Sequence, residues 1–262
     1  MSAPMEQFYR DYACHRAEEG RAVRGEELRL LPYLQSGPLA RQWAVRAKSF
    51  DAFVKQVLNP MAATRALEIL DLGAGNGWFC HRVASMGHRA VALDVRDDDV
   101  DGLGAARDFL IAVPGLFSCI KASFDDLPFC PNSFDITLFN ASLHYARDLR
   151  QVLAEAMQVT RPGGVVAILD SPFYAHERDG DAMVAEKLAQ GAARYGARAG
   201  VLLNQNFIEF LTQQRLSDAL TGLSWMRQKV RYPLWYEMRP FVARLKGRRR
   251  PSRFDLWTAR VP

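Results

Sequence analysis

An aspartate and three alternating glycines follow a short apolar run and could together bind a ligand. The run covers residues 67–72 and contains Asp71, and the glycines stand at positions 73, 75 and 77. Glycine permits positive φ angles and lets a ligand approach the backbone closely. A helix expected to begin near Trp78 would present free N–H groups to that ligand. The pattern predicts a ligand-binding turn, and a turn that only joins a strand to a helix is the alternative.

The spacing of the glycines argues against two common nucleotide-binding loops. A dinucleotide-binding turn that starts at Gly73 needs a third glycine at position 78, which is Trp78. A P-loop needs Gly-Lys followed by Ser or Thr, and none follows. A second acid, Asp94, ends the next apolar run, and a carboxylate there can accept both hydroxyls of a ribose. A solvated strand end is the alternative for Asp94.

These residues lie where short apolar runs alternate with helical stretches. We expect strands at residues 67–72, 89–94, 116–120, 134–139 and 165–170. We expect helices between them at residues 77–86, 98–112 and 147–160. Strand and helix in alternation predict right-handed βαβ units, and hence a mostly parallel sheet with helices on both faces.

The chain on either side of this region has a different pattern. Residues 1–65 show no convincing strand and predict helices at 2–19, 22–34 and 39–58, the last ending before Asn59-Pro60. After the alternating region we expect helices at residues 179–195 and 206–221 and strands at residues 224–231 and 254–261. The two late strands could close the sheet at one edge.

The arrangement D-x-G-x-G-x-G at residues 71–77 resembles motif I of class I S-adenosylmethionine (SAM)-dependent methyltransferases. Three further segments fall where that family has its motifs: Asp94, the stretch 123–135, and the Pro-Gly-Gly turn at 162–164. The second of these is similar to the type 11 methyltransferases, which include the quinone-biosynthesis group. The resemblance covers roughly residues 64–170. It implies a Rossmann-like class I methyltransferase fold, an α/β fold with a seven-stranded, mostly parallel sheet, an antiparallel last strand, helices on both faces and extra N-terminal helices.

The resemblance also implies SAM as the cofactor and S-adenosylhomocysteine as the product. In the family, the glycines lie against the methionyl part, the first acid orients the amino-acid end, and residues after the third strand border the adenine. This assigns cofactor binding to Asp71, Gly73, Ala74, Gly75, Gly77, Asp94, Val95, Phe124 and Asn140. Where the family has an acid after the third strand, this chain has Ser123. Either its hydroxyl replaces the carboxylate, or Asp125 supplies the contact.

His144 is the candidate general base, because an imidazole titrates near neutral pH and this one follows the fourth strand. A histidine that caps a helix or packs beside the cofactor is the alternative. The candidate acceptor pocket consists of His144, Tyr145, Tyr174 and Trp43. We expect no metal, since the four cysteines are scattered without C-x-x-C spacing.

The domain organisation follows from the same patterns. We expect a helical cap or lid at residues 1–65 and a SAM-binding domain at residues 66–262, with a helical insertion at about 172–222. Because these helices are additions to the core pattern, they are expected to determine which acceptor binds.

The net charge of +5 is unevenly distributed. Residues 225–262 contain eleven Lys or Arg and two acids, so the remainder of the chain is slightly acidic. The densest basic run, residues 246–253, could contact RNA, an anionic lipid or a sugar phosphate. We favour a solvated loop. Scattered cysteines, no apolar run of about 18 residues and no signal-peptide pattern predict a cytoplasmic protein without a transmembrane segment.

The sequence therefore predicts a methyltransferase that passes the SAM methyl group by SN2 transfer to the O, N or C atom of a small molecule. Two alternatives remain. One is an enzyme that methylates RNA or another macromolecule and uses the basic C-terminal segment. The other is a non-catalytic binding protein with the same fold.

Overall fold

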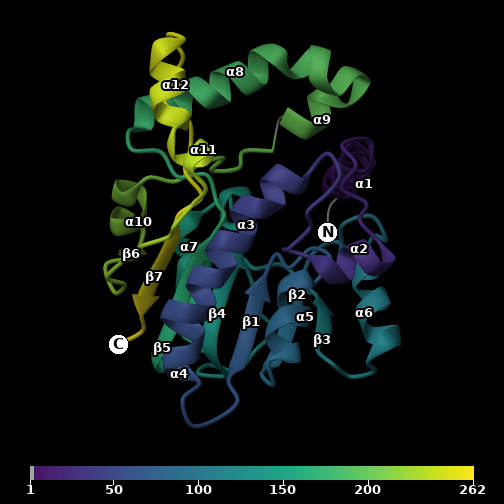
Figure 1. Ribbon diagram of the computed structural model, residues 1–262, viewed down its shortest axis with the longest axis vertical. Coiled ribbons are helices and arrows are strands. Elements are labelled where there is room, and N and C mark those ends of the chain that lie inside the picture. The colour runs from purple at the N-terminus through teal and green to yellow at the C-terminus, as the bar shows by residue number, and fades with distance from the viewer. Residues whose placement is uncertain (1–2, 204) are drawn as a thin grey trace.

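A computed structural model describes residues 3–203 and 205–262, and its centre is a single sheet. Within these residues the sheet has seven strands: β1 (Glu68–Leu72), β2 (Arg89–Asp94), β3 (Ser118–Lys121), β4 (Phe134–Asn140), β5 (Thr160–Leu169), β6 (Met226–Gln228) and β7 (Leu256–Arg260). Their order is β3-β2-β1-β4-β5-β7-β6 (Figure 1). Strands β1 to β5 pair in parallel, and β7 is antiparallel to both β5 and β6. The predicted fold class is confirmed.

The sheet is covered on both faces, which explains why its central strands β1 and β4 are almost wholly buried. Every residue of β4 is buried. Successive side chains of a strand point to opposite faces, so Ile69 packs with Phe50 and Phe79 on one face. Leu70 packs with Val152 and its neighbours on the other face. The two hydrophobic cores therefore fix the sheet between helices.

The helices and helical turns in the described residues are α1 (Ala3–Glu18), α2 (Gly25–Leu30), α3 (Ala40–Phe53), η1 (Val54–Leu58), α4 (Asn59–Met61), α5 (Trp78–Ser85), η2 (Leu103–Ala106), α6 (Arg107–Ala112), η3 (Leu143–Tyr145), α7 (Leu149–Val159), α8 (Glu177–Tyr195), η4 (Gly196–Arg198), α9 (Ala199–Leu203), α10 (Gln213–Ala219), α11 (Leu234–Glu237) and α12 (Arg239–Leu245). Figure 1 shows α1, α8 and α9 beyond the carboxyl ends of the parallel strands. No helix of the described residues has the length and apolar character needed to span a membrane.

Two N-terminal helices differ from their predicted bounds because of prolines. The helix expected at 22–34 is only α2, because Leu31 precedes Pro32 and has an extended ψ of 138°. A residue before proline is held out of the helical region. The helix expected to end before Asn59-Pro60 instead continues through the π-helical turn η1 into α4. Pro60 has no N–H to donate, and it directly follows the π-helical turn, a local irregularity of the kind found where a helical hydrogen bond is missing. Position 2 of the first predicted helix lies outside the described residues.

Two later predicted helices begin late because a side chain builds a turn first. The carboxylate of Asp98 accepts the N–H groups of Val100 and Asp101 at 3.0 and 3.1 Å, and helical structure begins only at η2. The helix expected at 206–221 is only α10, whose first turn is capped by the hydroxyl of Thr212, which accepts the N–H of Arg215 at 3.1 Å. Local side-chain hydrogen bonds of this kind compete with helix formation.

The late and edge strands also differ from their predicted bounds. β3 lies at residues 118–121 rather than 116–120, and β6 is confined to residues 226–228. β5 begins at Thr160, five residues before its expected start, because the Pro-Gly-Gly segment lies in a bulge opposite β4. Gly163 has a φ of 76° in that bulge, a value that glycine adopts without strain.

Candidate functional site

A cavity of about 1140 Å³ opens at the carboxyl ends of the strands. Its wall includes Gly73 after β1, Asp94 at the end of β2, Asn140 at the end of β4 and Asp170 after β5. Residues of α1 and α8 complete the wall on the side away from the sheet. Open α/β sheets bind ligands at this edge, beside the point where the strand order reverses. The volume lies slightly above the roughly 300–1,000 Å³ usual for a ligand pocket.

The structure brings most of the predicted site residues together around this cavity. Those that line it are Trp43, Gly73, Ala74, Gly75, Asp94, Val95, Ser123, Phe124, Asp125, Asn140, His144, Tyr145 and Tyr174. Asp71 and Gly77 do not line it. Asp71 lies inside the sheet at the end of β1, and Gly77 begins α5.

Two glycines of the loop are required by the space around them. Gly73 and Gly75 have φ angles of 74° and 55°. A Cβ atom on Gly73 would lie 2.5 Å from the Cβ of Ser142, and one on Gly75 would lie 3.1 Å from the carbonyl oxygen of Asp101. A Cβ atom on Gly77 would instead lie 3.2 Å from the ring of Phe117 in the core. The first two glycines therefore shape the cavity, while the third supports packing.

Asp71 carries a buried carboxyl group with no partner in the described residues. Its side chain is 0% exposed, and neither carboxyl oxygen accepts a hydrogen bond. Burial, followed by the nearby charge of Asp94, raises the pKa of Asp71 well above its usual range. A buried acid of this kind is stabilised by a proton or by a cation.

Asp94 is held at the cavity wall by the backbone. One carboxylate oxygen accepts the N–H of Gly75 and the other accepts the N–H of Arg96, both at 2.8 Å. Each oxygen keeps a further lone pair for a ligand. Burial raises the pKa of Asp94 and the two backbone donors oppose that rise. The fixed carboxylate is suited to accept a pair of neighbouring hydroxyl groups.

Ser123 and Asp125, the two alternatives for the adenine contact, are bonded to each other. The Ser123 hydroxyl donates to the Asp125 carboxylate at 3.0 Å and accepts the Asp125 N–H at 3.2 Å. Between them, Phe124 lines the cavity and packs edge-on against Phe139. This loop offers one aromatic face and one carboxylate to a bound ring, and the roles of the three residues stay predictions.

His144 lies on the cavity wall in η3, and its Nδ1 atom is buried without a partner in the described residues. Burial, with smaller contributions from Lys187, Arg16 and Arg46, lowers the pKa of His144 to about 3. The imidazole is therefore neutral near pH 7 and is a weak base. The neutral imidazole can form a hydrogen bond with a bound molecule, but it does not readily take up a proton.

Arg46 is a site residue that the sequence patterns did not reveal. Its guanidinium donates to Asp170 and to Asn140, each at 3.3 Å, at the ends of β5 and β4. It also lies 4.6 Å from the centre of the Trp43 ring. Ser49 donates to the other oxygen of Asp170 at 2.5 Å. Because α3 precedes the motifs by many residues, only the fold brings this arginine to the cavity.

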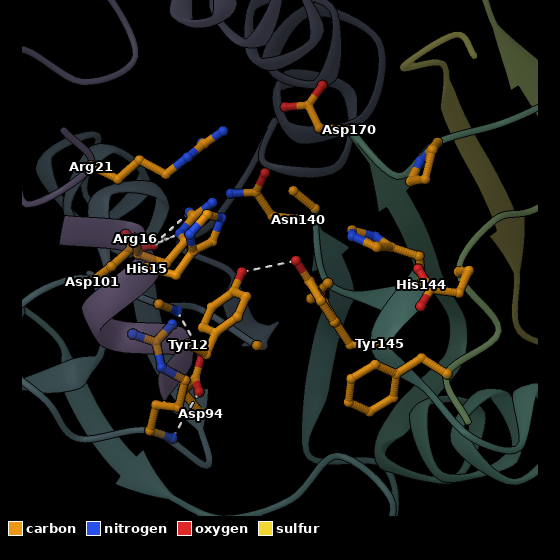
Figure 2. A pocket seen from close by; sticks show the side chains of 18 of the residues that line it. Tyr12, His15, Arg16, Arg21, Asp94, Asp101, Asn140, His144, Tyr145 and Asp170 are labelled. Carbon is orange, nitrogen blue, oxygen red and sulfur yellow. Dashed lines mark hydrogen bonds and ion pairs between the residues drawn. The ribbon is translucent and has the colours of Figure 1, made fainter. Parts of the chain in front are cut away.

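Helix α1 is fastened across the cavity from two sides (Figure 2). The hydroxyls of Tyr12 and Tyr145 are hydrogen-bonded at 2.8 Å, and Arg16 forms an ion pair with Asp101. On its outer side α1 pairs with the end of α8 and with η4, through Arg194 to Glu19 and Arg198 to Glu18. The helix therefore covers part of the cavity.

Two residues of the basic run, Arg249 and Ser252, also line the cavity. Arg249 lines the wall, donates to the Tyr174 hydroxyl at 3.1 Å and forms an ion pair with Glu186 of α8 at 2.8 Å. Its neighbours Arg248 and Arg250 are exposed. The expectation of a solvated loop therefore fails for Arg249. Among residues 3–203 and 205–262, no group of three or more His, Cys, Asp or Glu side chains is placed to hold a metal ion.

Comparisons with known proteins agree with this geometry. Residues 70–168 match the family described as "Methyltransferase domain". A malonyl-[acyl-carrier protein] O-methyltransferase of Buchnera aphidicola is 30% identical over 103 residues, 38% of each chain. An uncharacterized methyltransferase of Mycobacterium avium is 33% identical over 169 residues, 63% of this chain and 62% of its own. The chain thus spans between about two fifths and three fifths of the length of these two relatives.

Two solved structures share the fold at low sequence identity. The 1,6-didemethyltoxoflavin-N1-methyltransferase of Burkholderia thailandensis, solved with its substrate and S-adenosylhomocysteine, has a TM-score of 0.54 at 17% identity, covering 100% of this chain and 91% of its own. The YcgJ protein of Bacillus subtilis has a TM-score of 0.57 at 14% identity, covering 82% of this chain and 99% of its own. The matched segment, the sheet order and the glycine loop together identify residues 70–168 as a methyltransferase domain with the class I fold.

Proposed function

We propose that this protein transfers the methyl group of SAM to a small molecule bound in the same cavity. The observation that carries the proposal is the continuity of that cavity. One wall holds the glycine loop and Asp94, and another holds His144, Tyr174 and Arg249. A volume of about 1140 Å³ leaves room for an acceptor beside a cofactor.

The part of the cavity beside the glycine loop, here called the cofactor half, has hydrogen-bonding groups in fixed positions that suit SAM. Asp94 accepts the ribose hydroxyls, and the loop of Ser123, Phe124 and Asp125 borders the adenine. Gly73 and Ala74 let the methionyl part lie against the backbone. Opposite charges hold its two ends, with Asp71 for the ammonium and Arg46 for the carboxylate. Asp71 is buried and only 13% of the Arg46 side chain is exposed, so each charge interaction is stronger than at the surface.

The main contribution of the protein to the reaction is to position the two reactants. SAM, when bound, supplies a methyl group that its sulfonium already activates. The protein holds an acceptor atom in line with that methyl group and excludes water, which converts a bimolecular reaction into one between oriented groups. His144 lines this cavity, and we assign to its neutral imidazole the role of orienting the acceptor. Since its pKa is about 3, we assign it hydrogen bonding rather than strong general-base catalysis.

The acceptor half is proposed to lie under the added helices. Residues 1–65 would act as a cap on the domain at residues 66–262, and the insertion at about 172–222 would supply the opposite wall. α1 contributes Tyr12 and Arg16 to the cavity, and α8 contributes Glu186 and Lys187. Two similar proteins whose names state the methylated atom differ in that atom. One is an O-methyltransferase and the other is an N1-methyltransferase. The comparisons therefore support methyl transfer without selecting one acceptor.

Transfer of labelled methyl groups tests the proposal. The protein is incubated with [methyl-³H]SAM and a cell extract, and the products are separated by ultrafiltration into small molecules and macromolecules. We expect label in the small-molecule fraction, and little with the Asp94→Asn variant. Label confined to RNA or protein would contradict the small-molecule acceptor. Cofactor binding without any label in either fraction would favour a non-catalytic protein.

A further inference from the structure

Helices α11 and α12 carry an apolar face that is exposed to solvent. Its members are Leu234, Trp235, Met238, Phe241, Val242 and Leu245, which are between 38% and 76% exposed. Met238 joins the two helices and has helical backbone angles. At about 100° per residue, this spacing places all six side chains within roughly 120° of helix surface. They therefore form one continuous stripe, here called the apolar stripe.

The fold uses the other side of these helices. Tyr236 is 2% exposed, and its hydroxyl accepts the N–H of Phe254 at 2.8 Å. Arg239 donates to the carbonyl of Ser252 at 2.5 Å. In Figure 1, α12 stands at one end of the molecule, beside α8. The apolar stripe is thus an outer surface and contributes nothing to the core of the described chain.

A cationic hollow of about 280 Å³ adjoins the same helix. It is lined by Arg178 at the start of α8, Arg244 of α12, Arg248 and Arg250 of the following loop, with His176, Asp179 and Pro240. Within the described residues, none of these four arginines forms an ion pair or a side-chain hydrogen bond, although most other arginines do. Unpaired guanidinium groups that converge on one hollow favour a phosphate group as ligand.

We propose that the apolar stripe and this arginine hollow together bind the surface of an anionic lipid bilayer. Apolar side chains enter the boundary between headgroups and acyl chains, and the arginines contact lipid phosphate. A helix with one apolar face and basic flanks is typical of such interfacial binding. A second copy of the chain would fit the stripe less well, because the strongly basic residues 225–262 of the two copies would repel.

The proposal goes beyond methyl transfer and does not depend on it. Arg249 lies between two arginines of the hollow and itself lines the large cavity. A lipid surface bound here would therefore lie beside the cavity wall formed by Arg249 and Tyr174. Arg248 and Arg250 line the hollow while Arg249 lines the cavity, and the two sites share no lining residue.

Vesicle flotation of the full chain tests this proposal. We expect binding to vesicles of equimolar phosphatidylglycerol and phosphatidylcholine, at least tenfold weaker binding to phosphatidylcholine alone, and weakening as salt increases. The double variant Phe241→Asp/Leu245→Asp is expected to lose binding at least tenfold. Arg248→Glu/Arg250→Glu is expected to lose the preference for the anionic lipid. Ile111→Asp on α6 is the matched control, since Ile111 is 78% exposed and distant in sequence. Unchanged melting temperatures and cofactor binding establish that the variants fold.

Other results would overturn the proposal. No binding to anionic vesicles, together with a dimer that Phe241→Asp/Leu245→Asp abolishes, would assign the stripe to a second copy. Inorganic phosphate that protects the chain against unfolding, without any vesicle binding, would reduce the hollow to a site for free anions. Equal vesicle binding by the double variant and the Ile111→Asp control would remove the stripe from the interaction.

Discussion

The hydroxyls of Tyr12 and Tyr145 lie 2.8 Å apart and join α1 to the turn after β4 (Figure 2). The two residues are separated by 133 positions in the chain. Burial, followed by the proximity of Tyr12, raises the pKa of Tyr145 well above its usual value, so its phenol stays protonated. The hydrogen bond therefore persists over the whole range of physiological pH and keeps α1 across the cavity.

Removing this hydrogen bond should cost stability in a coupled way. Tyr12→Phe and Tyr145→Phe should each lower the free energy of unfolding by about 1 kcal/mol, because each leaves its partner hydroxyl unpaired. The double variant should lose less than the sum, with a coupling energy of about 0.5–1.5 kcal/mol. Denaturant unfolding of the four proteins measures this cycle. Strictly additive losses would show that the two hydroxyls do not interact in solution.

Alanine at Gly73 should abolish cofactor binding, whereas alanine at Gly115 should not. Both glycines have φ angles near 75°, so both variants pay a similar backbone strain of about 1–2 kcal/mol. A Cβ atom at Gly73 would overlap Ser142 in the cavity wall, while one at Gly115 meets nothing within 4 Å. Calorimetry with S-adenosylhomocysteine should show at least a tenfold loss for Gly73→Ala alone. Comparable affinities for the two variants would contradict the assignment of the loop.

The Asp94→Asn variant should bind S-adenosylhomocysteine about 10- to 100-fold more weakly. Its amide keeps the size of the side chain but replaces one charged acceptor with a donor, and hydrogen bonds to charged groups contribute about 1.5–3 kcal/mol. Asp97→Asn is the control, because Asp97 is exposed and pairs with Lys121 on the surface. If Asp94→Asn and Asp97→Asn bind the ligand equally well, Asp94 does not contact the ribose.

His144 should make the protein less stable as the pH falls. Its pKa is about 6.5 in the unfolded chain and about 3 in the folded chain. Between these values the unfolded state binds the proton that the folded state excludes, so stability decreases from pH 6.5 downward. From pH 7 to pH 5, the wild-type chain should lose about 1–2 kcal/mol more than His144→Gln, as measured by denaturant unfolding. Parallel pH profiles would mean that the imidazole takes up its proton in the folded state.

The same variant distinguishes the roles assigned to His144. His144→Gln should lower methyl transfer several-fold while leaving S-adenosylhomocysteine affinity nearly unchanged, because the side chain faces the acceptor half of the cavity. The amide of glutamine can replace part of the hydrogen bonding of the imidazole. His144→Ala should therefore lose more methyl-transfer activity than His144→Gln. Unchanged turnover in both variants would make His144 a packing residue.

Much of the fold could be predicted from local sequence because its central strands carry strong signals. β1, β2 and β4 each contain an apolar run with a polar residue at or next to the carboxyl end, and β2 matches its predicted bounds. Predictions failed where one side chain decided the backbone, as Asp98 does before η2 and Thr212 does before α10. Such hydrogen bonds depend on a single residue and leave no periodic pattern.

The site was predictable only on its cofactor side, where each residue belongs to a motif close to a strand end. The sequence pattern did not identify Arg46, because an arginine on a helix is usually exposed to solvent. It becomes a site residue only when α3 packs on the sheet and carries it to Asn140 and Asp170. Arg249 was missed for a related reason, since its role depends on where a loop between late elements returns to Tyr174.

Binding of S-adenosylhomocysteine measured by isothermal titration calorimetry tests the central claim most directly. We predict one molecule bound per chain by the wild-type protein, and at least tenfold weaker binding by Gly73→Ala with Gly115→Ala unaffected. The absence of binding by the folded wild-type chain at millimolar ligand would contradict the assignment of this cavity to SAM.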